Sequence, residues 1–247
     1  MRLDKFLADA GLGTRSQVKT IIRKGTITVN GIPARKPEQL IAPESDVICD
    51  GPRTLTTVSE TYYMLNKPAG YVSSTEEHDG PSVLSLLKDE SGHPVPGKGL
   101  FPAGRLDKDT EGLLLITNDG ALAHNLLSPK KHVEKTYFAL VKGLMSQNAV
   151  TAFENGLDIG EKRPTLPAKL TIVESGEEVS VVTVTIREGK FHQIKRMFEK
   201  IGSQVLYLKR ISFGNLTLDE TLAIGDFRPL TEDEIRQLKA GDTTHEQ

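Results

Sequence analysis

The feature that most constrains the fold of this chain is a series of short runs of β-favouring residues. Several of these runs follow one another without a helical segment between them. The runs lie at residues 62–65, 113–117, 136–141, 168–173, 181–186 and 205–208. Strands that follow one another without a crossover helix pair antiparallel. We therefore expect an α+β fold in which a mainly antiparallel mixed sheet is flanked by helices.

The composition is that of an ordinary globular protein, with 37% apolar and 26% charged residues. Cys49 is the only cysteine, which excludes an intrachain disulfide and a cysteine-rich zinc site. Residues 1–6 include an acidic residue and do not lead into an apolar signal segment, and no apolar run reaches membrane-spanning length. We expect a cytoplasmic protein that does not enter a membrane.

Charge is unevenly distributed along the chain. The net charge of −2 argues mildly against a nucleic-acid binder. However, residues 187–210 contain seven Lys and Arg against two acids, whereas residues 215–247 contain eight acids against three basic residues. A basic surface patch is therefore compatible with the near-neutral sum.

Residues 1–52 have the pattern of a small separate unit. Apolar residues at helical spacing predict a first helix, and Thr14 with Gln17 forms the capping box of a second. Asn30-Gly31 predicts a hairpin turn after a β-type run. The second helix leaves four basic side chains to solvent: Arg15, Lys19, Arg23 and Lys24.

On charge alone, these four residues form a solvated helix face. The order of cap, basic helix, strand and Asn-Gly turn resembles the S4 RNA-binding domain, and this resemblance implies that the four residues contact RNA. Residues 53–60 lack an apolar period and are interpreted as a flexible linker. We expect residues 61–240 to form one larger domain and residues 241–247 to be a frayed tail.

The segment Gly104-Arg105-Leu106-Asp107-Lys108-Asp109-Thr110-Glu111-Gly112 concentrates charged residues in front of an apolar run at 113–116. A polar loop beside a buried strand is a place where function gathers. Taken alone, Asp107 or Asp109 could cap a turn or pair with Arg105.

Three further segments have plain structural interpretations when taken singly. Asn66-Lys67-Pro68-Ala69-Gly70 is typical of a turn with an exposed lysine. Lys135-Thr136-Tyr137 is typical of a strand with a packed tyrosine. Residues 188–198 predict an amphipathic helix with a basic face.

Together and in this order, the four segments resemble the pseudouridine synthases that modify ribosomal RNA. The resemblance implies that Asp107 is the catalytic nucleophile, that Tyr137 packs against the target base and assists proton transfer, and that Lys195 pairs with Asp107. Arg105 is expected to fill the space that the target base vacates and to hold phosphate. Further substrate or RNA contacts are expected from Asn66, Lys67, Lys135, Lys190, His192 and Arg196.

Pseudouridine formation breaks the N1–C1′ bond of uridine, rotates the base and rejoins it through C5. It requires no redox step, no metal and no group donor. The chain has no phosphate-binding loop for ATP and no convincing dinucleotide fingerprint. His192 has no second ligand at zinc spacing. We therefore expect no cofactor and no metal.

Two more segments, 63–75 and 227–235, resemble the ribosomal small subunit pseudouridine synthase A branch, whose members modify one uridine of 16S rRNA. Three alternatives remain open: a large-subunit (23S) rRNA synthase, a non-catalytic S4-type RNA-binding or ribosome-assembly factor, and, less favoured, an S4-fused methyltransferase. We expect a monomer, acting on naked RNA or on a pre-ribosomal particle.

Overall fold

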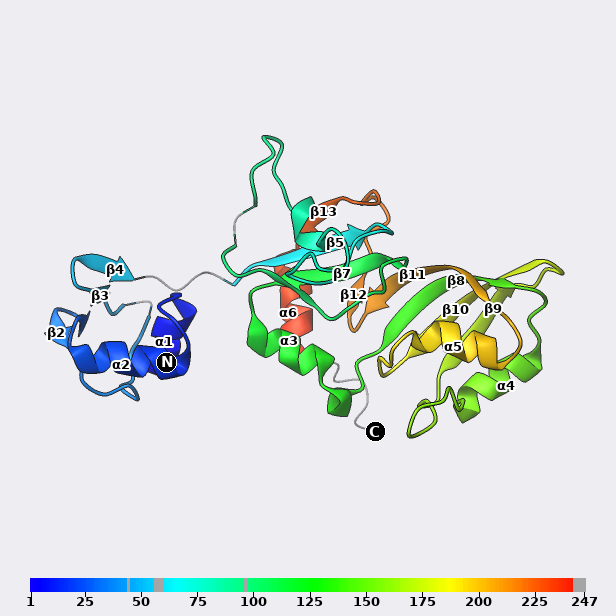
Figure 1. Ribbon diagram of the computed structural model, residues 1–247, viewed down its shortest axis with the longest axis horizontal. Coiled ribbons are helices and arrows are strands. Elements are labelled where there is room, and N and C mark those ends of the chain that lie inside the picture. The colour runs from blue at the N-terminus through cyan, green and yellow to red at the C-terminus, as the bar shows by residue number, and fades with distance from the viewer. Residues whose placement is uncertain (44, 56–59, 96, 242–247) are drawn as a thin grey trace. The chain divides into compact units, whose positions relative to one another are not determined.

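The computed structural model describes residues 1–43, 45–55, 60–95 and 97–241 (Figure 1). Its contacts divide the chain into two compact units, Met1–Glu60 and Thr61–Gln247, and each is described by itself below. Half of the predicted linker (56–59) and most of the predicted frayed tail (242–247) lie outside the described residues.

The first unit packs α1 (Leu3–Asp9) and α2 (Arg15–Lys24) against a small sheet of strand order β2-β1-β3-β4. The Thr14 capping box is present in both directions, which confirms the predicted helix start. Asn30 and Gly31 both have positive φ, 53° and 78°, as a type I′ hairpin turn requires. The strands are β1 (Ile27–Val29), β2 (Ile32–Pro33), β3 (Ile48–Asp50) and β4 (Arg53–Leu55).

The linker was predicted to begin at residue 53, which is too early in the chain. Arg53–Leu55 form β4 and pair antiparallel with β3. The reason is that Gly51, with φ of 55°, turns the chain back into a hairpin, and Leu55 is buried in the core of the unit. The Gly-Pro pair at 51–52, interpreted as the approach to a linker, is a turn within the sheet.

The second unit is built on a sheet of order β13-β5-β7-β11-β8-β10-β9. All its strand pairs are antiparallel except β7 with β11, so the predicted mainly antiparallel mixed sheet is confirmed. Two short strands, β6 and β12, pair at the side with β7 and β11. The bounds are β5 (Tyr62–Lys67), β6 (Phe101–Ala103), β7 (Glu111–Thr117), β8 (Lys135–Lys142), β9 (Lys169–Glu174), β10 (Val179–Ile186), β11 (Val205–Phe213), β12 (Leu216–Thr217) and β13 (Phe227–Pro229).

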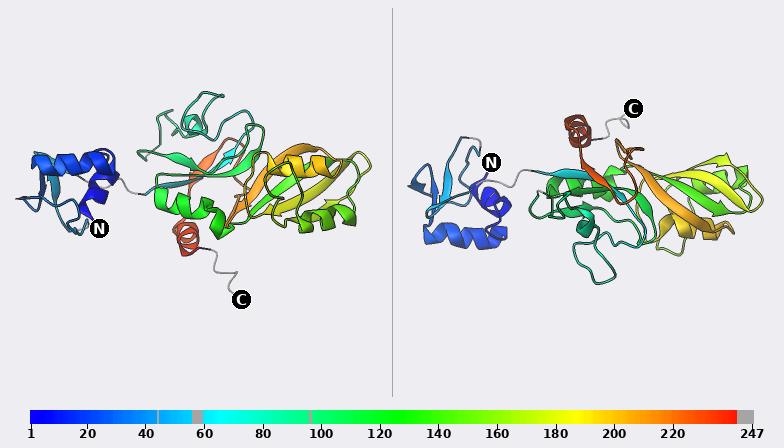
Figure 2. Two further views of the ribbon diagram at one scale, coloured as in Figure 1. Left: turned by 60° about the horizontal axis from the view of Figure 1, so that its bottom comes forward. Right: turned by 90° about the horizontal axis from the view of Figure 1, so that it is seen from above.

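Side-chain alternation along the strands divides the core into two clusters, one on each face of the sheet. In β7, Leu114 and Ile116 join the first cluster, whereas Leu113 and Leu115 join the second. The first cluster is covered by α4 (Gln147–Asn155), α5 (Gln193–Lys200) and the 3₁₀ turn η1 (Val83–Leu86). The second is covered by α3 (Gly120–Leu127) and α6 (Glu232–Ala240). Figure 2 shows α6 and α5 on opposite faces.

The parallel contact between β7 and β11 joins the two halves of this sheet. It consists of the register pairs Lys209↔Glu111 and Arg210↔Gly112. Gly112 has φ of 97°, and a Cβ placed on it would lie 2.3 Å from the carbonyl oxygen of Arg210. Glycine is therefore required for the backbones to approach this closely. Among the described residues, no helix is long and apolar enough to cross a membrane.

Candidate active site

The loop that carries Asp107 connects β6 to β7, and a buried lysine holds its backbone in place. Lys67, at the end of β5, is 0% exposed. Its ammonium group donates to four carbonyl oxygens: those of Pro68 (2.9 Å), Asp107 (3.2 Å), Lys108 (3.3 Å) and Thr110 (2.8 Å). One side chain thus sets the path of the loop.

Lys67 was expected to contact substrate; in this structure its ammonium group is enclosed by the loop that it holds. Burial lowers the pKa of Lys67 to about 8, although the carboxylates of Asp109, Glu111 and Asp107 act in the opposite direction. Lys67 is therefore a structural cation whose charge is sensitive to mildly alkaline pH.

A second set of contacts holds the Asp107 loop from the other side. The hydroxyl of Ser73 accepts from the Leu106 N–H and donates to the Leu106 carbonyl, both at 3.0 Å. The Gly70 N–H donates to the Lys108 carbonyl at 2.7 Å. The turn after β5 therefore packs directly on the loop and fixes the direction of the Asp107 side chain.

Asp107 lines a cavity of about 470 Å³. Side chains from both halves of the sheet contribute to the lining of this cavity. Tyr137, on β8 and 6% exposed, and Lys195, on α5, both line it. Arg105 is exposed and also lines it. The aliphatic lining of the cavity consists of Val72, Leu106, Ile186, Ile194 and Leu208. The three residues expected to be catalytic are thus brought together around one cavity.

Lys195 lies between two carboxylates. Its Nζ is 3.5 Å from Asp107 Oδ2 and 2.5 Å from Asp109 Oδ1. Burial is the largest single influence on the pKa of Asp109 and raises it, but the hydrogen bond and the charge of Lys195, together with smaller contributions, hold this pKa below its usual range. His192 Nε2 is 3.8 Å from Asp107 Oδ1. Lys195 thus faces Asp107, as the resemblance implied, but its shorter contact is to Asp109.

Asp109 was missing from the expected site residues. The signal was present, because Asp109 belongs to the same charged segment as Asp107. Which helix would face the segment could not be seen from the sequence alone. Thr110 was also missed; it is buried and lines the cavity.

The turn before α5 fixes the position of His192. This residue has φ of 50°, a left-handed conformation that non-glycine residues seldom adopt. Gln193 stabilises the turn, since its Oε1 accepts from the Lys190 N–H and its Nε2 donates to Glu188. Arg196 donates to the carbonyls of Phe191 and Ile159 and pairs with Glu161.

Four of the expected RNA contacts are side chains already engaged within the protein. Arg196 holds the turn, and Lys190 donates to the carbonyls of Arg163 and Pro164. Asn66 is 2% exposed and donates to the Leu222 carbonyl. Lys135 donates to the Val133 carbonyl and lies over the Phe213 ring; burial lowers its pKa to about 8, and the charge of Arg210 acts in the same direction.

Asn66 and Lys135 do not line the cavity of Asp107. Lys190 does line it, but with its ammonium group held by backbone carbonyls. The physical reason is the same in each case: the polar group satisfies a buried or partly buried backbone group, so it is not free to leave for RNA. The basic residues of α2 are all exposed, as expected: Arg15, Lys19, Arg23 and Lys24.

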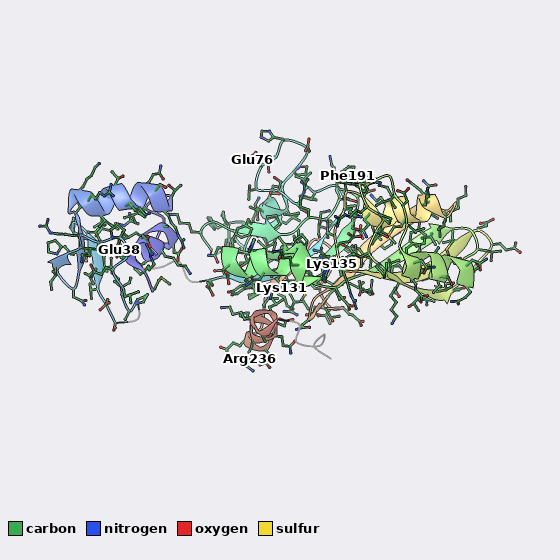
Figure 3. The ribbon with its side chains drawn as sticks, turned by 90° about the horizontal axis from the view of Figure 1, so that it is seen from below. Glu38, Glu76, Lys131, Lys135, Phe191 and Arg236 are labelled. Carbon is green, nitrogen blue, oxygen red and sulfur yellow. The ribbon has the colours of Figure 1, made fainter. Side chains whose placement is uncertain are left out.

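A larger cavity, of about 810 Å³, lies on the opposite face of the sheet. It is lined by residues of the second core cluster, including Leu122, Leu126 and Leu238, and by Lys130 and Lys131. In the part of the chain that the structure describes, no Asp or Glu lines it. It therefore lacks the carboxylate that pseudouridine formation, the reaction expected from the sequence, requires. Figure 3 shows Phe191, beside the smaller cavity, at the edge of the unit opposite to Arg236 of α6.

Comparisons with known proteins agree with this geometry. The model of the RNA pseudouridylate synthase family matches residues 61–200, and that of the S4 domain matches residues 1–48. The chain is 43% identical to the uncharacterized RNA pseudouridine synthase YtzG of Bacillus subtilis (strain 168), over 96% of this chain and 98% of that protein.

Two proteins called ribosomal small subunit pseudouridine synthase A are similarly close. The one from Yersinia pestis is 42% identical over 97% of this chain and 99% of that protein. The one from Escherichia coli (strain K12) is 42% identical over 95% and 98%. A crystal structure of a pseudouridylate synthase aligns with a TM-score of 0.67 and 39% identity, covering 96% of this chain and 99% of that one.

Proposed function

Since the chain belongs to the family of RNA pseudouridylate synthases and carries an S4 domain, we propose that it converts one uridine of small-subunit (16S) ribosomal RNA to pseudouridine with Asp107 as the nucleophile. The small-subunit substrate is supported by the relatives from Yersinia pestis and Escherichia coli, whose names refer to that subunit. The observation that carries the proposal is the placement of Asp107, Tyr137 and Lys195 around one cavity.

The reaction needs an ionised carboxylate beside C1′ of the target uridine. Lys195, 3.5 Å from Asp107, supplies the positive charge that favours this ionised form. The Asp107 carboxylate attacks C1′ as the N1–C1′ bond breaks. The freed base turns within the cavity, and C5 bonds to C1′ as the bond between C1′ and the Asp107 carboxylate breaks, which restores the free carboxylate. The proton on C5 is lost and N1 takes up one proton, so that the product is an isomer of the substrate.

The remaining residues bind and orient. Tyr137 presents its ring to the target base as a stacking surface. Extrusion of the uridine from its stack costs a few kcal/mol, and Arg105, exposed at the cavity, fills the vacated space and holds phosphate. The clamp formed by Lys67 and Ser73 keeps Asp107 aligned. We propose that the S4 unit adds RNA affinity through α2 and that the protein acts as a cytoplasmic monomer.

The experiment that tests the proposal is pseudouridine mapping of 16S and 23S rRNA from cells without this gene. The cells are complemented with wild type, Asp107→Asn or the control Asp233→Asn, whose side chain lies on α6. One 16S position should lose pseudouridine and regain it only with wild type and the control. A change confined to 23S would move the substrate to the large subunit.

Binding of 16S rRNA by purified Asp107→Asn separates catalysis from RNA binding. We expect this variant to bind RNA as wild type does and to form no pseudouridine. If the mapping shows no changed position while RNA still binds, the protein acts as a binding or assembly factor and the catalytic proposal fails.

A further inference from the structure

Phe191 is distinguished from every other aromatic residue of the chain by its exposure. The chain has eight Phe, five Tyr and no Trp, and all of them lie in the described residues. Only Phe191 is exposed, at 73%, and the others are buried or half-buried. A single exposed ring needs no explanation by itself, but this one belongs to neither core cluster of its unit and lines the cavity of Asp107.

The ring of Phe191 is held in a fixed orientation. It stacks on His192 with ring centroids 3.8 Å apart and an interplanar angle of 19°. His192 is in turn held by its left-handed backbone conformation, and the Phe191 carbonyl accepts from Arg196 at 3.0 Å. One face of the Phe191 ring is thus covered by imidazole, and its exposed surface is presented without the entropic cost of ordering a free side chain.

This stacked pair lies at the catalytic cavity. Both rings line it, and His192 Nε2 is 3.8 Å from Asp107 Oδ1. A ribose whose C1′ meets Asp107 therefore lies beside the pair, and the base of that nucleotide turns inward toward Tyr137. The outer surface of Phe191 is left for a different base.

We propose that Phe191, supported by His192, is a stacking platform for the base of a nucleotide adjacent to the target uridine. The inference rests on the proposed function, because it takes Asp107 to mark the position of the target ribose. A flat aromatic surface accepts any base by stacking, so the platform holds the flanking nucleotide in place while its neighbour is extruded.

The absence of Trp from this chain makes a direct test possible. Phe191→Trp, combined with Asp107→Asn to prevent turnover, contains one Trp, located on the platform. Its probe is a single-stranded RNA nonamer with a central uridine between adenosines. We expect the nonamer to quench the Trp fluorescence, whereas Val173→Trp, at an exposed position of β9 outside the cavity, should not respond.

Two further nonamers identify the stacked base. Each keeps the phosphates but replaces the 5′ or the 3′ neighbour of the uridine by an abasic ribose. Quenching should be lost for one of the two. Quenching that persists with both abasic RNAs, or that never occurs, would overturn the proposal, whether or not the protein proves to be a pseudouridine synthase.

Steady-state kinetics on 16S rRNA test the role of the ring. Loss of base stacking on Phe191→Ala should raise KM by about 5- to 100-fold, with a smaller change in kcat. Phe191→Leu keeps apolar surface without a ring and should resemble Ala, whereas Phe191→Trp should retain the wild-type KM. A Leu variant equal to wild type would contradict stacking. Absence of product from every protein, wild type included, would instead contradict the proposed function.

Discussion

At the scale of single residues, two lysines have opposite relations to solvent around the same aspartate loop. Lys195 is partly exposed and faces the carboxylates of Asp107 and Asp109. Lys67 is fully buried and donates to backbone carbonyls, three of them in the loop and one at Pro68. In the proposed mechanism, the first sets the charge environment of Asp107 and the second sets its position. Removing either should reduce activity, for different reasons.

Lys195→Met should lower the single-turnover rate on 16S rRNA by about 10²- to 10³-fold, which is typical for loss of one electrostatic partner at a reacting centre. Lys195→Arg should keep part of the rate because the positive charge remains. The matched control is Lys200→Met, at an exposed position of the same helix, which should equal wild type. A Lys195→Met rate within threefold of wild type would rule out this role.

Activity should decline above about pH 8, because Lys67 loses its proton there and a neutral amine has too few N–H groups for the carbonyls that it holds.

The contribution of Lys67 to the stability of the fold should change with pH in the opposite direction to the activity. The pKa of Lys67 is depressed in the folded state, so between pH 8 and about 10.4 the unfolded chain binds more protons, and this group's contribution to the free energy of unfolding rises with pH.

Measuring kcat/KM and urea unfolding across pH 7 to 10 checks both directions. Lys135 also has its pKa lowered to about 8, so Lys135→Met provides the control and should keep the alkaline fall of activity. A wild-type activity that stays constant up to about pH 9.5 would contradict the role given to Lys67. If Lys135→Met no longer loses activity at alkaline pH, the alkaline loss is due to Lys135 and not to Lys67.

At the scale of elements, the strands could be predicted well from the sequence, because apolar runs of β-favouring residues indicate segments that are buried locally. The runs at 113–117 and 136–141 became β7 and β8, and the capping box of α2 was located to the residue. The position of β11 between β7 and β8 could not be predicted from the same evidence, because strand order depends on contacts between distant segments.

The same limit explains the errors at the site. Lys67 precedes a Pro-Gly turn, which is typical of an exposed lysine, but its strand pairs with β7, and Lys67 lies opposite Gly112. That pairing places the ammonium group under the Asp107 loop. The three residues predicted to be catalytic line one cavity in the structure. Their charged segment and two motifs are visible in the sequence, but the distances between them required the fold.

Gly112→Ala should lower the free energy of unfolding by about 3 kcal/mol or more, because the new Cβ would overlap the Arg210 carbonyl and separate β7 from β11. Gly143→Ala is the matched control: its φ is 81°, but nothing lies within 4 Å of the added Cβ, so only the backbone strain of about 1–2 kcal/mol applies. Urea denaturation measures both. Equal losses would show that the β7–β11 contact tolerates a side chain.

At the scale of the whole molecule, each unit has its own hydrophobic core. Among the described residues, the cluster that contains Leu3, Phe6, Val18 and Ile22 is made of residues of the first unit. Changes on the surface of α2 should therefore leave the catalytic unit folded and its chemistry intact. This independence makes RNA affinity and catalysis separately adjustable.

Replacing Arg15, Lys19, Arg23 and Lys24 by Gln should weaken RNA binding and reduce the slope of log K against log salt by about 3–4, if each residue contacts one phosphate. The turnover rate at saturating RNA should be retained. The control neutralises four exposed lysines of the second unit, Lys142, Lys162, Lys169 and Lys200. If both sets change the slope equally, α2 has no special part in binding.

The place of β11 in the sheet also determines when during translation this protein can become active. β11 is made after the other long strands of its unit, yet it lies between β7 and β8. A nascent chain that ends before it holds two incomplete sheets with open edges, which are prone to wrong pairing. Asp107 precedes β7 and Tyr137 lies on β8, so the two remain apart until β11 has left the exit tunnel and joined both sheets.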